Sequence, residues 1–274
     1  MAPWHDKVVI LTGSSSGIGQ GTAIHFASLG CRVVVTGRNP DRLHQTADLC
    51  IKAGAKPEHI LTVRGDVAKD ETVKTIVDGT VDRFGRIDVL VNNAGVAVWD
   101  DIEHTSLEHF DTTFNTNVRG PFHLTMLVVP HLIKTKGCNY FVCCLAYKVH
   151  ITDLLVILLQ LQELLTYSMS KAALDHFTRM LAVQLGPKGV RVNSVNLGEI
   201  RTPMAMTTGM SDEQYEEFME QASRLTPLGR YGNLDDVVKA IAFLASDDSS
   251  FITGINMPVD GGWQCVHPYT TFMT

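Results

Sequence analysis

KVVILTGSSSGIGQGTAIHFASL, residues 7–29, is the stretch that decides the fold. Val8–Leu11 is a short apolar run with two β-branched valines, which predicts a buried parallel strand. A loop rich in glycine and serine follows at 12–19, and the residues after it predict a helix. A loop in that place can aim backbone N–H groups and a helix N-terminus at a diphosphate. A plain glycine turn is the alternative, but the order of strand, loop, helix and second strand favours a dinucleotide site.

The composition is that of an ordinary folded protein. With 274 residues, 45% hydrophobic and 19% charged, we expect a single α/β domain over residues 1–274. The net charge of −6 provides no basic surface for nucleic acid. The six cysteines show no metal-ligand or disulfide spacing, which predicts no metal site and favours a reducing compartment. We see no signal peptide and no run that spans a membrane, so the cytoplasm is the default expectation.

The spacing of the loop, T-G-x-x-x-G-I-G over 12–19, resembles the classical short-chain dehydrogenase/reductase (SDR) family. Further motifs of that family follow in family order, namely Asn92-Asn93-Ala94-Gly95, Asn117, Tyr167-Ser168-Met169-Ser170-Lys171 and Val259-Asp260-Gly261-Gly262. The resemblance extends over most of the chain. It implies a Rossmann-type, doubly wound parallel sheet of about seven strands, a nicotinamide cofactor, a small-molecule carbonyl or alcohol substrate, and a homotetramer or homodimer.

The end of the second predicted strand, 32–36, indicates which cofactor is used. An acidic residue there would accept a hydrogen bond from a ribose 2′-hydroxyl, whereas an arginine can pair with a 2′-phosphate. Residues 36–38 hold Arg38 and no carboxylate, so NADP(H) is favoured over NAD(H). A solvated arginine ahead of a helix is the alternative.

The resemblance implies a wider set of cofactor contacts at the loop and at the strand ends. They are Gly13, Ser15, Ser16, Gly17, Ile18, Gly19, Arg38, Asp66, Val67, Asn93, Ala94, Gly95, Tyr167, Lys171, Gly198, Ile200 and Thr202. Asp66 would hold the adenine edge, although it could also cap a helix that starts at Lys69. The family usually has Pro-Gly where this chain has Leu197-Gly198, and the proline's restraint on φ is lost. Residues 204–228 resemble the family's substrate lid.

Tyr167 and Lys171 carry the clearest chemical signal. A spacing of four residues puts both on one helical face, roughly 6 Å apart at Cβ. An unperturbed tyrosine has a pKa of about 10, and a nearby ammonium lowers that pKa because it favours the phenolate. The resemblance implies that Tyr167 gives a proton to the carbonyl oxygen as hydride arrives, while Lys171 also binds the nicotinamide ribose. It implies that Asn117 distorts its helix and holds a water linking the lysine to solvent.

Residues 139–166 depart from the family pattern. The family places a serine shortly before the tyrosine, where it hydrogen-bonds the substrate oxygen, but no serine occurs between Ser106 and Ser168. The predicted fifth strand, 138–144, ends in two cysteines, and a leucine-rich run leads from there towards Tyr167. A leucine-rich active-site loop is out of place, because that loop ordinarily holds small and polar residues.

Three interpretations of 139–166 are open. The segment is foreign to the fold, such as a mis-spliced or wrongly translated stretch. Or it is a diverged loop, which makes a cofactor-binding pseudoenzyme or a partner-binding helix. Or Cys144 or Thr152 replaces the serine and leaves a slow enzyme, since the loss of one oxyanion donor typically costs on the order of 10²–10³ in rate. We therefore predict an NADP(H)-dependent oxidoreductase with impaired catalysis, and keep as the alternative an inactive nucleotide-binding protein that acts through partners.

Overall fold

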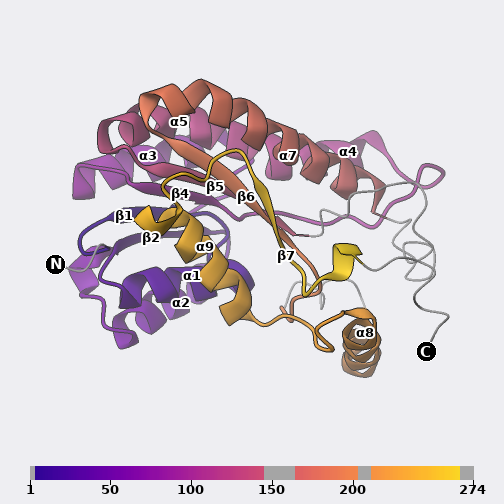
Figure 1. Ribbon diagram of the computed structural model, residues 1–274. Coiled ribbons are helices and arrows are strands. Elements are labelled where there is room, and N and C mark those ends of the chain that lie inside the picture. Colours follow the sequence, from indigo (N-terminus) through magenta and orange to yellow (C-terminus); the bar gives the residue numbers. More distant parts are fainter. Residues whose placement is uncertain (1–3, 145–163, 203–210, 266–274) are drawn as a thin grey trace.

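The computed structural model describes residues 4–144, 164–202 and 211–265, with side chains omitted at 139–144. In this part of the chain, seven parallel strands form one sheet in the order β3-β2-β1-β4-β5-β6-β7 (Figure 1). The strands are β1 (Val8–Leu11), β2 (Arg32–Gly37), β3 (Ile60–Arg64), β4 (Val89–Asn92), β5 (Cys138–Cys144), β6 (Arg191–Leu197) and β7 (Asn256–Val259). The direction of winding reverses between β1 and β4, as in a doubly wound Rossmann-type sheet. The predicted fold class is confirmed.

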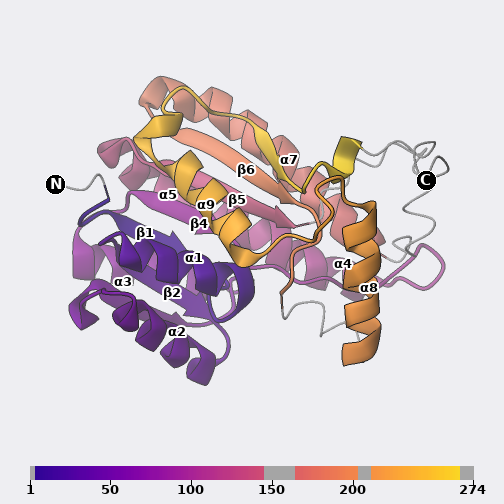
Figure 2. The same ribbon diagram turned by 60° about the horizontal axis from the view of Figure 1, so that its bottom comes forward.

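Helices cover both faces of this sheet. They are α1 (Gly17–Ser28), α2 (Pro40–Lys52), α3 (Asp70–Phe84), α4 (Leu107–Phe114), α5 (Gly120–Thr135), α7 (Leu165–Leu185), α8 (Asp212–Leu225) and α9 (Leu234–Ala245). Helices α1, α2 and α9 pack on one face, and α3, α5 and α7 on the other (Figure 1). Figure 2 shows α8 beyond the carboxyl ends of the central strands. This is the edge at which open α/β sheets bind their ligands.

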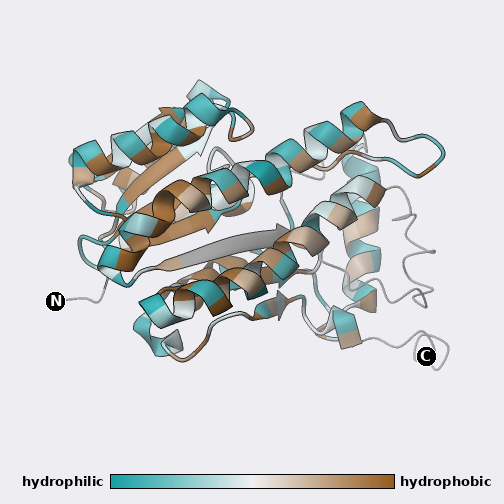
Figure 3. Cartoon of the chain, turned by 90° about the horizontal axis from the view of Figure 1, so that it is seen from above, coloured by the Kyte–Doolittle hydropathy of each residue, from teal (hydrophilic) through white to brown (hydrophobic). Residues whose placement is uncertain are grey.

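Alternate residues of β1 enter two separate apolar cores. Val9 and Leu11 join the core beneath α1, α2 and α9, whereas Val8 and Ile10 join the core beneath α3, α5 and α7. All four side chains are fully buried. A parallel strand covered on both faces must be apolar at every position, which is why its sequence reads as an unbroken hydrophobic run. Figure 3 shows the polar colour concentrated on the outer sides of the helices.

The helical stretch that begins at Leu107 is divided into α4, a π-helical segment Asn115–Arg119 (η2), and α5, so the helix is distorted where Asn117 lies, as expected. The structure differs from the expectation at Asp66. Helix α3 begins at Asp70, and its N-cap Lys69 makes no side-chain capping bond. Asp66 accepts a hydrogen bond from the backbone N–H of Ala68 at 2.9 Å, so it closes a local turn before the helix. The capping role considered for Asp66 is therefore wrong.

The atypical segment is bracketed by well-defined elements. Strand β5 lies between β4 and β6 as far as Cys144, and α7 begins at Leu165. Residues 145–163, including Thr152, lie outside the described residues, and so does the side chain of Cys144. The first part of the predicted lid, 204–210, is outside them as well. The described part of the predicted lid, 211–228, contains α8, which starts with a capping box between Ser211 and Gln214.

Candidate active site

The glycine loop is held at the ends of β1 and β2 by buried hydrogen bonds. The Ser14 hydroxyl donates to the Leu11 carbonyl at 3.0 Å and accepts from the Thr36 backbone N–H at 2.8 Å. Gly13 has φ of +64°, a left-handed conformation that favours glycine. A Cβ on Gly13 would lie 2.7 Å from the Cα of Ala94, too close for any side chain. The loop therefore needs glycine at this position both for its turn and for its contact with the end of β4.

Asn93 and Thr12 join the ends of β1 and β4. The Asn93 amide nitrogen Nδ2 donates to the carbonyl oxygens of Thr12 and Gly13 at 2.9 and 3.0 Å. In return, the Thr12 hydroxyl accepts from the backbone N–H groups of Asn93 and Ala94 at 2.9 and 3.0 Å. This reciprocal pairing fixes the two loops against each other. Asn93 therefore ties the strand ends together, and Thr12, whose role the sequence did not indicate, supplies half of the tie.

A hollow of about 480 Å³ opens over these loops at the carboxyl edge of the sheet. Most of the predicted cofactor contacts line it: Gly13, Ser15, Ser16, Gly17, Ile18, Arg38, Asp66, Val67, Asn93, Ala94, Gly95 and Thr202. It is also lined by residues that the sequence did not single out, among them Asn39, Arg42, Val96, Ala97 and Thr116. This lining fits the shape and charge of a dinucleotide. It offers bare backbone at the glycine loop, polar groups between the strand ends and arginines at one end.

The end of the hollow beside β2 is basic. Arg38 and Arg42 both line it, and both are exposed. Gly37 lets the strand end pass close to the glycine loop, because a Cβ there would already lie 3.1 Å from Ser15. Arg42 follows Arg38 by four residues, across the Asn39 cap of α2. That spacing was a readable signal, since two guanidinium groups at one strand end can share a phosphate.

Five predicted cofactor contacts do not line the hollow: Tyr167 and Lys171, which are described below, and Gly19, Gly198 and Ile200. Gly19 faces inward, where a Cβ would collide with the side chain of Asn93. Gly198 packs against Asp260, whose Cα would lie 2.8 Å from an added Cβ. Ile200 forms an isolated parallel bridge with Gly232.

Tyr167 and Lys171 lie together on the first turns of α7, with only 2% and 3% of their surfaces exposed. The Lys171 Nζ is 5.2 Å from the centroid of the Tyr167 ring. A Cβ on Gly95 would lie 3.6 Å from this Nζ and 3.4 Å from the Asn117 Oδ1. Gly95 also lines the hollow, so Lys171 and Asn117 lie directly behind its lining, and Tyr167 adjoins Lys171.

Asn117 lies in the π-helical segment and is fully buried. Its Oδ1 accepts from the Val96 N–H at 2.8 Å, and its Nδ2 donates to the Val96 carbonyl at 2.9 Å and to the Ser170 hydroxyl at 3.0 Å. The Ser170 hydroxyl donates in turn to the Tyr167 carbonyl at 2.6 Å. The side chain of Asn117 thus ties the loop after β4 to α7. The helix is distorted at this point, in the way that π-bulges often mark functional sites.

Helix α8, in the predicted lid, contacts the same edge through Tyr215. The Tyr215 hydroxyl donates to the Thr202 carbonyl at 3.5 Å, a weak bond. Burial raises the pKa of Tyr215 above its ordinary value. Among residues 4–144, 164–202 and 211–265, no helix has the length and apolarity to cross a bilayer, and no cluster of His, Cys, Asp and Glu could hold a metal ion.

The comparisons with known proteins agree over nearly the whole chain. The family model described as Enoyl-(Acyl carrier protein) reductase matches residues 13–264. An uncharacterized oxidoreductase of Thermotoga maritima is 36% identical over 93% of this chain and 96% of its own length. The 3-oxoacyl-(acyl-carrier-protein) reductase FabG of the same organism is 33% identical over 93% of this chain and 97% of its own.

A solved structure gives the same result for the fold. The short-chain dehydrogenase/reductase of unknown function from Caenorhabditis elegans, solved with cofactor, matches with a TM-score of 0.89. It is 33% identical, and the match covers 98% of each chain. Since sequence and fold agree from the glycine loop to the last strand, this chain belongs to the short-chain dehydrogenase/reductase family, oxidoreductases that act on CH–OH and C=O groups with a nicotinamide cofactor.

Proposed function

We propose that this protein reduces the carbonyl group of a small molecule, or oxidises the corresponding alcohol, with Tyr167 as the acid/base group. The observation that carries the proposal is that Lys171 and Asn117 adjoin Gly95, which lines the hollow, while Tyr167 lies beside Lys171. A proton donor, an ammonium group and a positioning amide are thereby gathered beside a space that suits a dinucleotide.

The roles follow from the chemistry of each side chain. When bound, the nicotinamide supplies or accepts the hydride. Tyr167 gives its proton to the carbonyl oxygen of the substrate, and in the reverse direction it takes the proton from the alcohol. Lys171, whose Nζ lies 5.2 Å from the tyrosine ring, favours the phenolate form by its charge. Asn117 holds in place the loop that carries Val96. We also propose that Asn117 binds a water molecule that links Lys171 to solvent.

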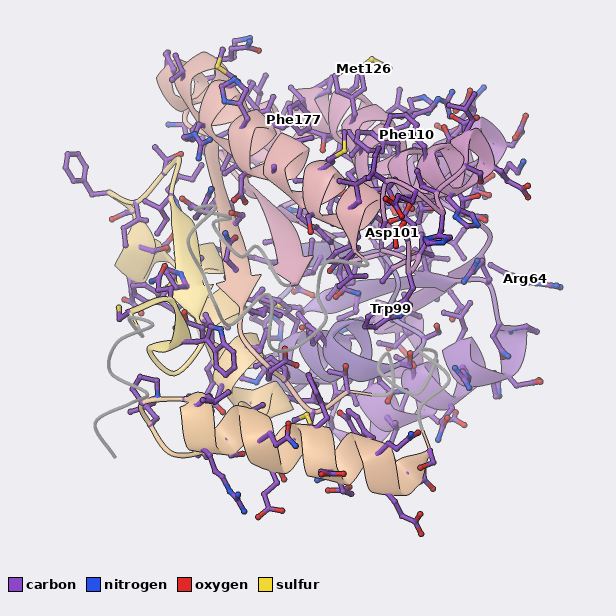
Figure 4. The ribbon with its side chains drawn as sticks, turned by 90° about the vertical axis from the view of Figure 1, so that its right-hand side faces the viewer. Arg64, Trp99, Asp101, Phe110, Met126 and Phe177 are labelled. Atoms are coloured by element: carbon purple, nitrogen blue, oxygen red, sulfur yellow. The ribbon has the colours of Figure 1, made fainter. Side chains whose placement is uncertain are left out.

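The cofactor proposed is NADP(H). The glycine loop with Asn93, Ala94 and Gly95 would hold the diphosphate and nicotinamide side, and Asp66 with Val67 the adenine. Gly198, Ile200 and Thr202 would support the nicotinamide end. Arg38, joined by Arg42, would pair with the 2′-phosphate, for which planar guanidinium groups are well suited. We expect Arg38→Asp to lose the preference for NADPH over NADH. Arg64→Asp is the matched control, because Arg64 ends the next strand and projects away from the site (Figure 4).

We propose that turnover is slow, because no serine occurs among residues 107–167 to hold the substrate oxygen. Removal of one such donor typically lowers kcat on the order of 10²–10³-fold. A second candidate function, a nucleotide-binding protein that acts through partners without turnover, rests on the same missing serine. The three interpretations of residues 139–166 remain distinct, and activity separates the slow enzyme from the other two.

The deciding experiment is oxidation of NADPH by the purified chain against a panel of ketones and dicarbonyls, with cofactor binding followed by fluorescence. We expect slow turnover that Tyr167→Phe abolishes while NADPH binding persists. Turnover that survives in Tyr167→Phe would refute the role of the tyrosine. Binding without any turnover would favour the partner-binding alternative.

We also propose a homo-oligomer, a dimer or tetramer, formed through the outer faces of α5 and α7. Met126 is 54% exposed on α5 and Val183 is 73% exposed on α7, and Figure 4 shows Met126 and Phe177 on the same side of the molecule. Between the helices, the rings of Phe122 and Phe177 lie in tilted contact with centroids 5.5 Å apart. Exposed apolar faces of this kind are typical of subunit contacts. Light scattering should give the mass of a dimer or larger, and Val183→Glu should reduce it. A monomeric mass for the native chain would refute the proposal.

Residues 1–274 are proposed to form one domain that works in the cytoplasm. The support for a reducing compartment is that Cys31, Cys50, Cys138 and Cys265 are all free thiols in the described part of the chain. Fractionation of cells that express the chain would test the location.

A further inference from the structure

Asp100 is a buried acidic residue for which the proposed chemistry has no use. It follows the loop after β4, and only 3% of its surface is exposed. Its neighbours in the chain, Trp99 and Asp101, lie at the end of the molecule that Figure 4 faces. A carboxyl group is costly to bury unless hydrogen bonds compensate it, so its contacts indicate what it does.

Both carboxyl oxygens of Asp100 are hydrogen-bonded, and most of the bonds lead to one residue of α7. The Thr166 hydroxyl donates to Oδ2 at 2.8 Å, and the Thr166 backbone N–H donates to Oδ1 at 3.2 Å. The Thr105 hydroxyl also donates to Oδ2, at 2.7 Å. The backbone carbonyl of Asp100 accepts from the N–H of Leu165 at 3.1 Å. Asp100 therefore binds the two consecutive residues that start α7.

Helix α7 lacks a cap of its own. Its N-cap is Leu164, whose side chain has no atom that could accept a hydrogen bond. The first N–H groups of a helix have no partner within the helix, and a buried helix start without one would be unstable. Asp100, 66 residues earlier in the chain, provides both the carboxyl oxygen and the backbone oxygen that these N–H groups need.

We call the hydrogen bonds that join Asp100 to Leu165 and Thr166 the clamp. The clamp ends at Thr166, the residue directly before Tyr167. On the other side, the Ser170 hydroxyl donates to the Tyr167 carbonyl and is itself held by Asn117. The backbone of the tyrosine is thus tethered from both directions. Its ring is 2% exposed, so a change in the first turn of α7 would redirect the hydroxyl relative to Lys171.

We propose that Asp100 is a positioning residue for proton transfer by Tyr167, because it caps α7 and fixes the direction in which the tyrosine points. This inference rests on the function proposed above. It makes the loop after β4 part of the catalytic geometry, although Asp100 does not touch the reacting atoms.

The test uses two pairs of variants. Asp100→Ala removes the carboxyl group of the clamp. Asp101→Ala is its matched control, because the Asp101 side chain bonds Glu103 and His104 within its own exposed turn. Thr166→Val removes one clamp hydroxyl with little change in shape, and Thr166→Ser restores it. If Asp100→Ala fails to fold, the threonine pair still decides the question.

We expect Asp100→Ala and Thr166→Val to lower kcat by about 10- to 100-fold, the cost of a small misplacement of a catalytic group. The affinity for NADPH should be unchanged, and the pH dependence of kcat should be displaced because the tyrosine moves relative to Lys171. Asp101→Ala and Thr166→Ser should behave as the native chain. A fall in kcat that only follows the loss of folded protein, with the pH profile in place, would overturn the proposal.

Failure of the proposed function is separable from failure of the clamp. If the native chain shows no turnover with any carbonyl, the proposed function fails. The positioning role of the clamp is then tested by an ultraviolet difference titration that measures the titration midpoint of Tyr167. The chain carrying Tyr167→Phe is the reference. We expect the titration midpoint to shift in Thr166→Val and to return in Thr166→Ser. An unchanged midpoint in both would overturn the positioning role.

Discussion

Replacement of Gly13 by alanine separates two physical costs in the glycine loop. Gly13 has φ of +64°, and an L-residue in the left-handed region costs about 1–2 kcal/mol. In addition, the new Cβ would lie 2.7 Å from the Cα of Ala94, which is backbone and cannot rotate away. Overpacking of this kind adds about 1–3 kcal/mol. We therefore expect Gly13→Ala to lower the free energy of unfolding by about 2–5 kcal/mol.

Gly85 provides the matched control. Its φ is +73°, close to that of Gly13, but an added Cβ would meet no atom within 4 Å. Gly85→Ala should therefore lose only the conformational part, about 1–2 kcal/mol. Unfolding in urea, followed by circular dichroism, gives both values on one scale. Equal losses in the two variants would refute the argument, because they would show that Ala94 yields to the new atom without cost.

The same pair predicts an effect on cofactor binding. The contact of Gly13 with Ala94 brings the glycine loop against the end of β4, and both line the hollow. An alanine at Gly13 must move one of them, so NADPH binding measured by fluorescence should be lost or strongly weakened. Gly85 ends α3 and does not line the hollow, so Gly85→Ala should bind NADPH as the native chain does. Normal binding by folded Gly13→Ala would contradict the assignment of this hollow to the cofactor.

Three further predictions concern single side chains. The guanidinium of Arg230 lowers the pKa of Asp236 from 3.8 to about 2, so this ion pair stabilises the fold above pH 3.8, and the stabilisation is lost as the pH falls towards about 2. Asp236→Asn should flatten that part of an acid-unfolding curve, and an unchanged curve would contradict the prediction. Thr12→Val should cost about 1–3 kcal/mol in urea unfolding and Thr12→Ser much less, because two buried N–H groups lose their acceptor; equal effects would speak against it. Burial raises the pKa of the Cys31 thiol to about 12, so iodoacetamide should modify the exposed Cys265 before Cys31. Mass spectrometry of the peptides gives the order, and modification of Cys31 ahead of Cys265 would disprove the burial of Cys31.

Local signals in the sequence were sufficient for the nucleotide side of the site. The strand before Gly13 is apolar at every position because both of its faces are covered, and the loop, Arg38 and Asp66 each follow a strand directly. Chain order alone therefore brings them to one edge of the sheet. Arg42 lies beyond the strand end, within α2, so the pattern of the strand end alone did not indicate it.

The supports of the catalytic residues could not be read in the same way. Asp100 and Thr166 look like ordinary polar residues, and their hydrogen bonds join positions 66 residues apart. The resemblance implied a distortion at Asn117, but the hydrogen bonds from Asn117 to Val96 and Ser170 join elements that are distant in the chain. Asp66 satisfied the pattern of a cap, but its carboxyl oxygen bonds Ala68 in a tight turn. Such contacts depend on the packed tertiary structure.

The order of strands has a consequence for synthesis on the ribosome. Strands β3, β2, β1 and β4 are neighbours, so the sheet that supports most of the nucleotide hollow can assemble once the chain has emerged as far as Asn92. Strand β5 gains its second neighbour only when β6 appears, after residues 145–163. Parallel pairing across such distances is slow, and domains form in order from the N-terminus. Sequence changes in 145–163 would therefore act late in folding, on the half that carries Tyr167, after the nucleotide half has formed.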